Sequence, residues 1–207
     1  MSSRSLLVVG YGGHARVCEE IALQTDYSDV FFVDDAVMGE KVVGKIDYRT
    51  LVKLRGEFED CIVGIGNNSV RRVMTADVED AGYKLINLIH PTAIVSRSAS
   101  IGNGVLVCAG SVIGVNSVIA NGVIVNTGVI VDHDCKIDSY VHLAPGSTIC
   151  GGVTVGTGTL VGANSTVLPC IGIGRETILG AGAIVTKEIG DGVVATGAPA
   201  RAIKANR

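Results

Sequence analysis

Aliphatic residues recur at every sixth position through the second half of the chain. Counting in steps of six from Ile89 to Val185 gives seventeen positions, and all of them are Ile, Val or Leu. The fourth residue after each is often small or β-branched, as at Ser111 and Thr177. A period of six fits neither a helix, which repeats about every 3.6 residues, nor a hairpin meander. It predicts a parallel β-helix in which three hexads form one eighteen-residue coil and the aliphatic side chains point inward.

The first half of the chain has a different pattern, in which short apolar runs alternate with polar segments. Ser5–Val9, Val30–Val33 and Cys61–Ile65 are expected to form strands, and the spacing of Val17 and Ile21 predicts a helix after the first of them. Strands that alternate with helices are typical of α/β folds with a parallel sheet. This half is therefore predicted to be one mononucleotide-binding, Rossmann-like unit.

Composition changes at the same point of the chain. Residues 1–88 contain 24 of the 37 charged residues and seven of the eight aromatic residues, whereas residues 89–207 contain 19 of the 28 glycines. A segment with a single aromatic residue must bury small aliphatic side chains in a narrow, regular space. We therefore predict two domains, an α/β domain over residues 1–88 and a β-helix over residues 89–207. A glycine-rich β-sandwich would not keep the six-residue phase for so long.

Charge, hydropathy and cysteine content argue against several classes of protein. The net charge is −3 and no stretch is rich in Lys or Arg, which argues against a nucleic-acid partner. No apolar run reaches the roughly 18 residues of a membrane span. The six cysteines form neither a CxxC motif nor a Cys/His cluster, so no metal site is expected. Because the N-terminal residues lack the layout of a signal peptide, we expect reduced thiols and a cytoplasmic location.

A glycine-rich segment, Gly10–Ala15, follows the first predicted strand. Gly12 and Gly13 would let the backbone approach a phosphate at a helix N-terminus, and Asp34 or Asp35, after the second strand, could bind a ribose hydroxyl or a base edge. The segment also satisfies the loose dinucleotide pattern G-x-G-x-x-A, but 88 residues hold about one of the two halves that NAD requires. A nucleotide-diphosphate ligand fits better, and a purely structural glycine turn is the remaining alternative.

One histidine has a carboxylate directly beside it. His133 lies two places after the inward Val131, so its side chain should face outward, and Asp134 follows it. Histidine is the side chain that most often transfers protons near neutral pH. A neighbouring carboxylate orients the ring and raises its basicity. The pair is therefore a candidate catalytic base, and a solvated turn is the alternative interpretation.

The coil length places other residues relative to His133. Gly151 lies eighteen residues further on and should stack beside it, where the absence of a side chain would leave room for a substrate and expose a backbone N–H to an oxyanion. His142 lies half a coil away, so the two histidines should occupy different faces of the prism and meet only across a subunit boundary. Cys135 takes an inward position, where packing is a better interpretation than an acyl-enzyme nucleophile. Since each coil contacts only its neighbours, the faces are flat and a small-molecule site must form between prisms.

The chain resembles the bacterial nucleotide-amino-sugar N-acetyltransferases, which are hexapeptide-repeat acyltransferases related to sialic acid O-acetyltransferases. The likeness spans essentially the whole chain and rests on the segments VVGYGGHA, FVDD, IGNN, NLIHP, VNTGVIVDHDC and GAPAR. It implies that the β-helix is left-handed, that acetyl-CoA is the co-substrate, and that the protein is a homotrimer with its sites at the subunit boundaries.

The resemblance also implies roles for individual residues. His133 and Asp134 match the catalytic pair, and Asn126 matches a position near the reacting amine. The acetyl-CoA positions match His142, Gly151, Ala163 and Ala181. The positions that hold the nucleotide sugar match Gly12, Gly13, His14, Asp34, Asp35 and Gly66. Family members often have serine where this chain has Gly12, so a side-chain contact at that position is not carried over.

The expected function is therefore that of a cytoplasmic homotrimeric N-acetyltransferase. It would move acetyl from acetyl-CoA to the amine of a UDP- or dTDP-linked sugar, such as a 4-amino-4,6-dideoxyhexose, for glycan or lipopolysaccharide synthesis. The alternative enzyme is an O-acetyltransferase of a sialic-acid-like sugar, and the alternative without chemistry is a solenoid that serves as an assembly scaffold.

Overall fold

The structure, a computed structural model, describes residues 4–37 and 39–206. The chain forms two compact units that meet between Pro91 and Thr92, whereas the composition places the boundary after Leu88. Each unit is described below by itself.

The first unit contains a five-stranded parallel sheet with the strand order β3-β2-β1-β4-β5. Three of its strands are those predicted from the sequence, although the third predicted strand is the fourth along the chain. The pattern missed two helices and, within this sheet, two short strands. The elements are β1 (Ser5–Val9), α1 (Gly13–Leu23), β2 (Asp29–Val33), β3 (Val42–Gly44), α2 (Tyr48–Leu54), β4 (Asp60–Val63), α3 (Asn68–Asp80), β5 (Lys84–Leu85) and β6 (Leu88–Ile89).

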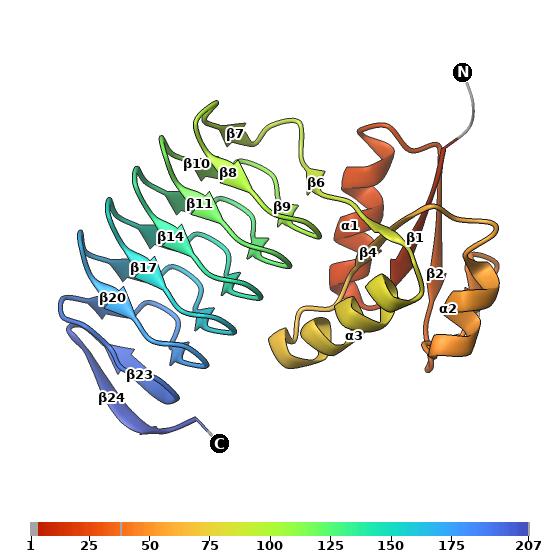
Figure 1. Cartoon of the computed structure of the whole chain (residues 1–207). Coiled ribbons are helices and arrows are strands. Elements are labelled where there is room, and N and C mark those ends of the chain that lie inside the picture. Colours follow the sequence, from red (N-terminus) through yellow and green to blue (C-terminus); the bar gives the residue numbers. More distant parts are fainter. Residues whose placement is uncertain (1–3, 38, 207) are drawn as a thin grey trace. The chain divides into compact units, whose positions relative to one another are not determined.

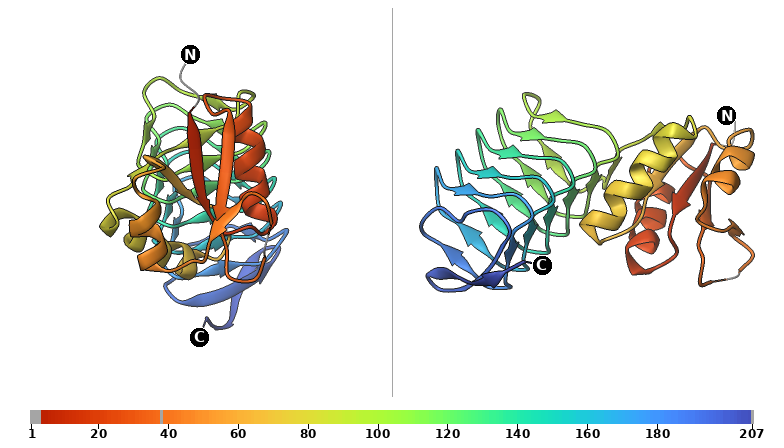
Figure 2. Two further views of the ribbon diagram at one scale, coloured as in Figure 1. Left: turned by 90° about the vertical axis from the view of Figure 1, so that its right-hand side faces the viewer. Right: turned by 60° about the horizontal axis from the view of Figure 1, so that its bottom comes forward.

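Helices cover both faces of this sheet, and its central strands β1 and β4 are apolar apart from their first residues, Ser5 and Asp60. Leu7 and Val9 of β1 pack in one cluster with Leu51 of α2 and Val78 of α3. Helix α1 lies on the other face (Figure 2). A Cβ on Gly64 would lie 2.8 Å from the α1 backbone, so glycine at this position permits the close approach of α1. The sheet thereby holds the start of α1 at the carboxyl ends of β1 and β4.

The second unit is a stack of three-sided coils whose sides are two-residue strands (Figure 1). The first side contains β7, β10, β13, β16, β19 and β22, the second contains β8, β11, β14, β17 and β20, and the third contains β9, β12, β15, β18 and β21. Their bounds are β7 (Ile94–Val95), β8 (Ser100–Ile101), β9 (Leu106–Val107), β10 (Val112–Ile113), β11 (Val118–Ile119), β12 (Ile124–Val125), β13 (Ile130–Val131), β14 (Lys136–Ile137), β15 (His142–Leu143), β16 (Thr148–Ile149), β17 (Thr154–Val155), β18 (Leu160–Val161), β19 (Thr166–Val167), β20 (Gly172–Ile173), β21 (Ile178–Leu179) and β22 (Ile184–Val185).

The strand register confirms the eighteen-residue coil. Ile113 pairs with Val131, and Val131 pairs with Ile149. These three side chains are at most 1% exposed and form one inward column. The stack ends in an antiparallel hairpin of β23 (Val193–Gly197) and β24 (Ala200–Ala205).

Most buried hydroxyl groups inside the prism find hydrogen-bond partners at the corners, whereas the buried Ser147 Oγ has none among the described residues. The residues four places after each aliphatic position include Ser117 and Thr159, which are fully buried. The Ser117 hydroxyl donates to the Asp132 carbonyl at 2.6 Å, and the Thr159 hydroxyl donates to the Gly174 carbonyl at 2.6 Å. Buried hydroxyls with such partners cost little, so each corner can be both narrow and polar.

We expect Val131→Asp to prevent folding, because Val131 is 0% exposed and its replacement would bury a carboxylate without a charged partner. Val118→Asp makes the same change on the outer side of β11, where the valine is 43% exposed, and should leave the melting temperature close to that of the wild type. Circular dichroism and thermal melting compare the two variants. A Val131→Asp protein that melted like the wild type would show that the hexad register is wrong.

Candidate active site

The corner between β13 and β14 carries a histidine and a carboxylate in contact. His133 Nδ1 lies 2.8 Å from Asp134 Oδ2, and both side chains are more than half exposed, which confirms the predicted outward direction of His133. Because a carboxylate only accepts hydrogen bonds, Nδ1 carries the proton and the lone pair is on Nε2. Nε2 is therefore the ring atom that can take a proton from a substrate.

Carboxylates on both sides increase the basicity of this histidine. The hydrogen bond to Asp134 and the nearby charge of Asp132 raise the pKa of His133 above its usual value. The Asp134 carboxyl accepts from His133 and also from the Asn116 amide, whose Nδ2 lies 3.2 Å from Oδ1. These hydrogen bonds lower the pKa of Asp134. Asp132 and Asn116 were not predicted as site residues from the sequence, although Asn116 lies one coil before Asp134.

Gly151 lies directly beside the histidine ring, as its spacing from His133 predicts. A Cβ on Gly151 would be 2.5 Å from both Nε2 and Cε1 of His133. Gly151 is buried, and the His133 imidazole lies against it. Its predicted contact with the substrate stays a prediction. A side chain at this position would displace the ring.

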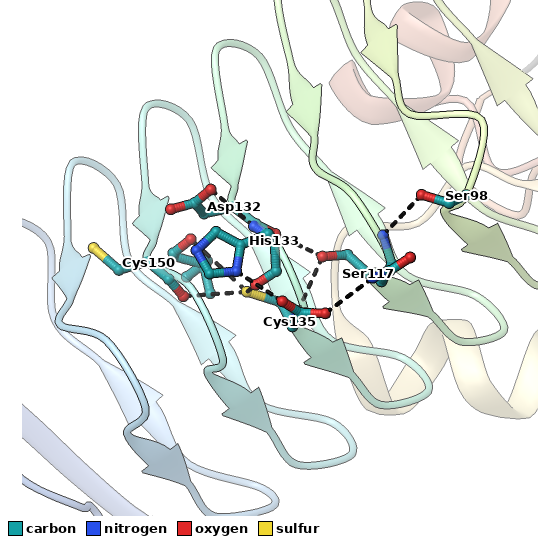
Figure 3. Close-up of polar contacts among 9 residues, drawn as sticks. Ser98, Ser117, Asp132, His133, Cys135 and Cys150 are labelled. Carbon is teal, nitrogen blue, oxygen red and sulfur yellow. Dashed lines mark hydrogen bonds and ion pairs between the residues drawn. The ribbon is translucent and has the colours of Figure 1, made fainter.

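The cysteine of this corner is part of the packing. Cys135 is 1% exposed, and its thiol donates to the Cys150 carbonyl at 3.2 Å (Figure 3). Burial raises the pKa of the Cys135 thiol. A buried, protonated thiol is a poor nucleophile, so these observations favour direct attack by the substrate over an acyl-enzyme.

Two further predicted site residues meet on another side of the prism. Asn126 follows β12 and His142 lies on β15, and Asn126 Nδ2 is 3.1 Å from His142 Nε2. Within one chain, Asn126 is therefore hydrogen-bonded to His142, whereas it was predicted to act with His133 near the reacting amine. Ala163 follows β18 and Ala181 follows β21, so the two stack at the corner after the third side of the prism. There the N–H of Gly182 donates to the Ala163 carbonyl at 2.8 Å. The acetyl-CoA candidates other than Gly151 thus lie apart from the His133 corner.

In the first unit, the predicted nucleotide residues gather at the carboxyl ends of β1, β2 and β4. A Cβ on Gly12, Gly13 or Gly66 would meet no atom within 4 Å, and none of the three has a positive φ. Neither packing nor backbone conformation therefore explains glycine at these positions. Open space in front of a helix N-terminus suits a phosphate that approaches the backbone closely.

The two acidic residues after β2 hold the neighbouring loops together. Asp34 accepts from the N–H of Tyr11 at 2.8 Å and from the N–H groups of Ala36 and Val37 at 2.9 and 3.0 Å. Asp35 accepts from the Ile46 N–H at 3.0 Å. Both carboxylates thus have structural partners in addition to any ligand.

A buried arginine lies at the same edge and was not predicted. Arg71 of α3 is 2% exposed and donates to the carbonyls of Ile65 and Gly66, each at 3.1 Å, and to Asn68 Oδ1 at 2.9 Å. Burial, together with the nearby Arg71 guanidinium, lowers the pKa of His14 to about 4. His14 is therefore neutral near pH 7.

Membrane-spanning helices and metal-binding clusters were searched for in the described residues, 4–37 and 39–206. None of the helices there has the length and apolar character needed to cross a bilayer. Within the same residues, no group of three or more His, Cys, Asp or Glu side chains is arranged to hold a metal ion.

Residues 5–78 match the family described as PglD N-terminal domain. Two curated relatives align with the chain. One is a GDP-perosamine N-acetyltransferase of Escherichia coli O157:H7, 31% identical over 69% of this chain, and the other is a UDP-N-acetylbacillosamine N-acetyltransferase of Bacillus subtilis, 38% identical over 51% of this chain. The chain spans 65% of the length of the first relative and 52% of the second.

Several solved structures match nearly the whole chain. The acetyltransferase domain of PglB from Neisseria gonorrhoeae, solved with acetyl coenzyme A, is 38% identical with a TM-score of 0.92, and the match covers 98% of this chain and 100% of that one. PerB from Caulobacter crescentus, solved with CoA and GDP-perosamine, is 39% identical with a TM-score of 0.91, and the match covers 96% and 97%. Like them, this protein combines a Rossmann-like domain with a left-handed parallel β-helix. The chain belongs to the hexapeptide-repeat family of sugar N-acetyltransferases.

Proposed function

We propose that the protein transfers acetyl from acetyl-CoA to the amine of a nucleotide-linked amino sugar. The observation that carries this proposal is the outward His133–Asp134 pair, in which the protonated Nδ1 faces the carboxylate and Nε2 is left as a base. The solved relatives that bind CoA, acetyl-CoA and GDP-perosamine support the same substrates for this chain.

The residues present can perform the chemistry by direct attack. When bound, acetyl-CoA supplies an activated acetyl group. His133 Nε2 takes a proton from the sugar amine as the nitrogen bonds to the acetyl carbon, and the imidazolium then returns a proton to the departing thiolate sulfur. Asp134 stabilises the imidazolium between these two steps. No nucleophile from the protein is needed, which agrees with the buried Cys135 thiol.

The nucleotide part of the substrate is proposed to bind in the first unit. The open glycines Gly12, Gly13 and Gly66, the neutral His14 and the acidic pair Asp34 and Asp35 lie at one edge of its sheet. We keep a UDP- or dTDP-linked 4-amino-4,6-dideoxyhexose as the proposed sugar. A GDP-linked sugar is the other candidate, because one curated relative and the PerB complex carry GDP in their names.

An O-acetyltransferase of a free sialic-acid-like sugar is the weaker proposal, since it would have no use for a nucleotide site. Screening GDP-, UDP- and dTDP-linked amino sugars with acetyl-CoA, with release of the CoA thiol as the readout, tests the assignment. Turnover of a free sugar acid and of none of the nucleotide sugars would overturn it.

We also propose a cytoplasmic homotrimer. Asn126, the residue predicted near the reacting amine, and His142, an acetyl-CoA candidate, lie on a different side of the prism from His133. A site that combines them with His133 therefore needs a second subunit. A closed three-fold ring gives every subunit the same contact. All six cysteines are unpaired, which is typical of a reducing compartment.

The proposed base can be tested by its pH profile. His133→Ala should lower kcat by about 10²–10⁴, the usual range for a lost base, while both substrates still bind. Asp134→Ala should cost less, because the imidazole remains. The neutral histidine is the active form, so kcat/KM rises as the pH passes the pKa of His133. Since the carboxylate raises that pKa, its removal should move the acidic limb to lower pH. Trimeric His133→Ala with more than about a tenth of the wild-type kcat would contradict the mechanism.

The phosphate approach can be tested at Gly13, in the first turn of α1. Gly13→Ala adds a methyl group where no protein atom lies within 4 Å, so the melting temperature should be unchanged or slightly raised. The KM for the nucleotide sugar should rise, and the KM for acetyl-CoA should not. Gly56→Ala is the matched control, because a Cβ there also meets open space but lies outside the proposed site. If both variants had the same KM for the sugar, the proposal that the phosphate binds at this turn would be wrong.

The shared site can be tested by complementation. His133→Ala subunits and His142→Ala subunits are mixed, reassembled and compared with the two parent trimers at low acetyl-CoA concentration. If each site takes His133 from one subunit and His142 from its neighbour, random mixing in a cyclic trimer should restore about one quarter of the wild-type sites. Activity that stays at the average of the parents would show that both histidines act within one chain.

A further inference from the structure

The carboxylate that contacts His133 is itself held from the preceding coil. Asn116 and Asp134 are eighteen residues apart and share a left-handed backbone conformation, with φ at 57° in both. Asn116 Nδ2 lies 3.2 Å from Asp134 Oδ1, whereas Oδ2 of the same carboxylate faces His133 Nδ1 at 2.8 Å. The Asn116 backbone N–H donates to Ser98 Oγ at 3.1 Å (Figure 3). One line of contacts thus crosses three coils and ends at the imidazole.

The fold alone does not require an amide side chain at position 116. A left-handed corner favours glycine, asparagine or aspartate but does not demand an amide, since glycine takes the equivalent corner position at Gly110 and Gly128 and Tyr140 takes it at another corner. The Asn116 residue is exposed. Its one hydrogen bond to another side chain among the described residues goes to Asp134.

We propose that Asn116 is a positioning residue for the acetyl transfer, which acts by fixing the rotation of the Asp134 carboxylate. This inference rests on the proposed role of His133 as the base. Asp134 is 58% exposed and would otherwise be free to turn both oxygens toward water. With Oδ1 anchored to Asn116, Oδ2 stays on Nδ1, so the ring keeps the tautomer in which Nε2 is the base.

An amide suits this task better than a cation. A lysine or arginine at position 116 would also hold the carboxylate, but its charge would oppose the effect of Asp134 on His133. The amide donates a hydrogen bond without adding charge, so it fixes the orientation of Asp134 and leaves its negative charge available to the imidazolium.

The ionisable groups around His133 are few, which makes its titration readable. Asp132 and Asp134 belong to its own corner, and the thiols of Cys135 and Cys150 belong to the same corner and the next coil. Burial raises the pKa of both thiols, so neither titrates in the acidic limb of the profile. Asn116 carries no charge in either state. A change in the limb after mutation of Asn116 therefore reports on the His133–Asp134 contact.

The test compares variants that keep the left-handed corner. Asn116→Gly should lower kcat by about three- to tenfold, as expected for one lost hydrogen bond, with both KM values unchanged. Its acidic limb should move to lower pH, in the direction of Asp134→Ala but by less. Asn164→Gly is the matched control, since Asn164 also has a positive φ of 54° at the equivalent position of another corner. Its pH profile should equal that of the wild type.

A double mutant separates positioning from a structural role. In an Asp134→Ala background, Asn116→Gly should have no further effect on kcat, because the group that it orients is already absent. Independent, multiplicative losses would overturn the proposal, and so would a wild-type profile for Asn116→Gly. If His133→Ala kept its activity, the base assignment itself would fail, so the two failures are distinguishable.

Discussion

One constraint, the regular stacking of each coil on the next, determines which side chains of the second unit lie next to one another. Backbone N–H groups donate to carbonyls of the adjacent coil at 2.8–3.1 Å, as from Val112 to Val129 and from Thr154 to Ile171. Because a slip of one residue would turn the aliphatic side chains outward, the register is fixed over the whole stack. Residues eighteen apart therefore stand side by side at the surface as well. The contact between His133 and Gly151 and the contact between Asn116 and Asp134 both follow from this geometry.

The same constraint explains how an exposed site can be precise. His133 and Asp134 are more than half exposed, and charged pairs at such positions are usually loose. Here the backbone beneath them is held on both sides by neighbouring coils, and each side chain is limited by a residue of an adjacent coil, Gly151 or Asn116. Sequence positions 98–131 and 139–174 contain no Asp, Glu, Lys or Arg. Few other charged side chains can therefore compete with Asp132 and Asp134 for interaction with the His133 imidazole.

The features that follow from period and coil length could be predicted, whereas those that depend on side-chain direction or tertiary packing could not. The inward column at Val131 and the contact between His133 and Gly151 can be predicted from the eighteen-residue coil length alone. The amide of Asn116 reaches Asp134 because both residues have a left-handed backbone, which the hexad does not reveal. Arg71 was missed because arginine is rarely buried, and it is tolerated here because backbone carbonyls and Asn68 accept from it. Helix α2 has only seven residues, too few for a clear helical period, although Asp47 caps it by accepting from the Thr50 N–H.

The hairpin at the end of the stack limits how far the solenoid can grow. A coil of parallel strands that ended bluntly would offer unpaired N–H and C=O groups to any similar coil, and such ends invite fibre formation. Strand β23 takes the place of the next coil by pairing with β21, and β24 then reverses direction. The pairing of β23 with β24 is irregular at Val194, and β24 carries Arg201 and Lys204. Irregular pairing and positive charge on β24 disfavour the addition of another strand at this edge.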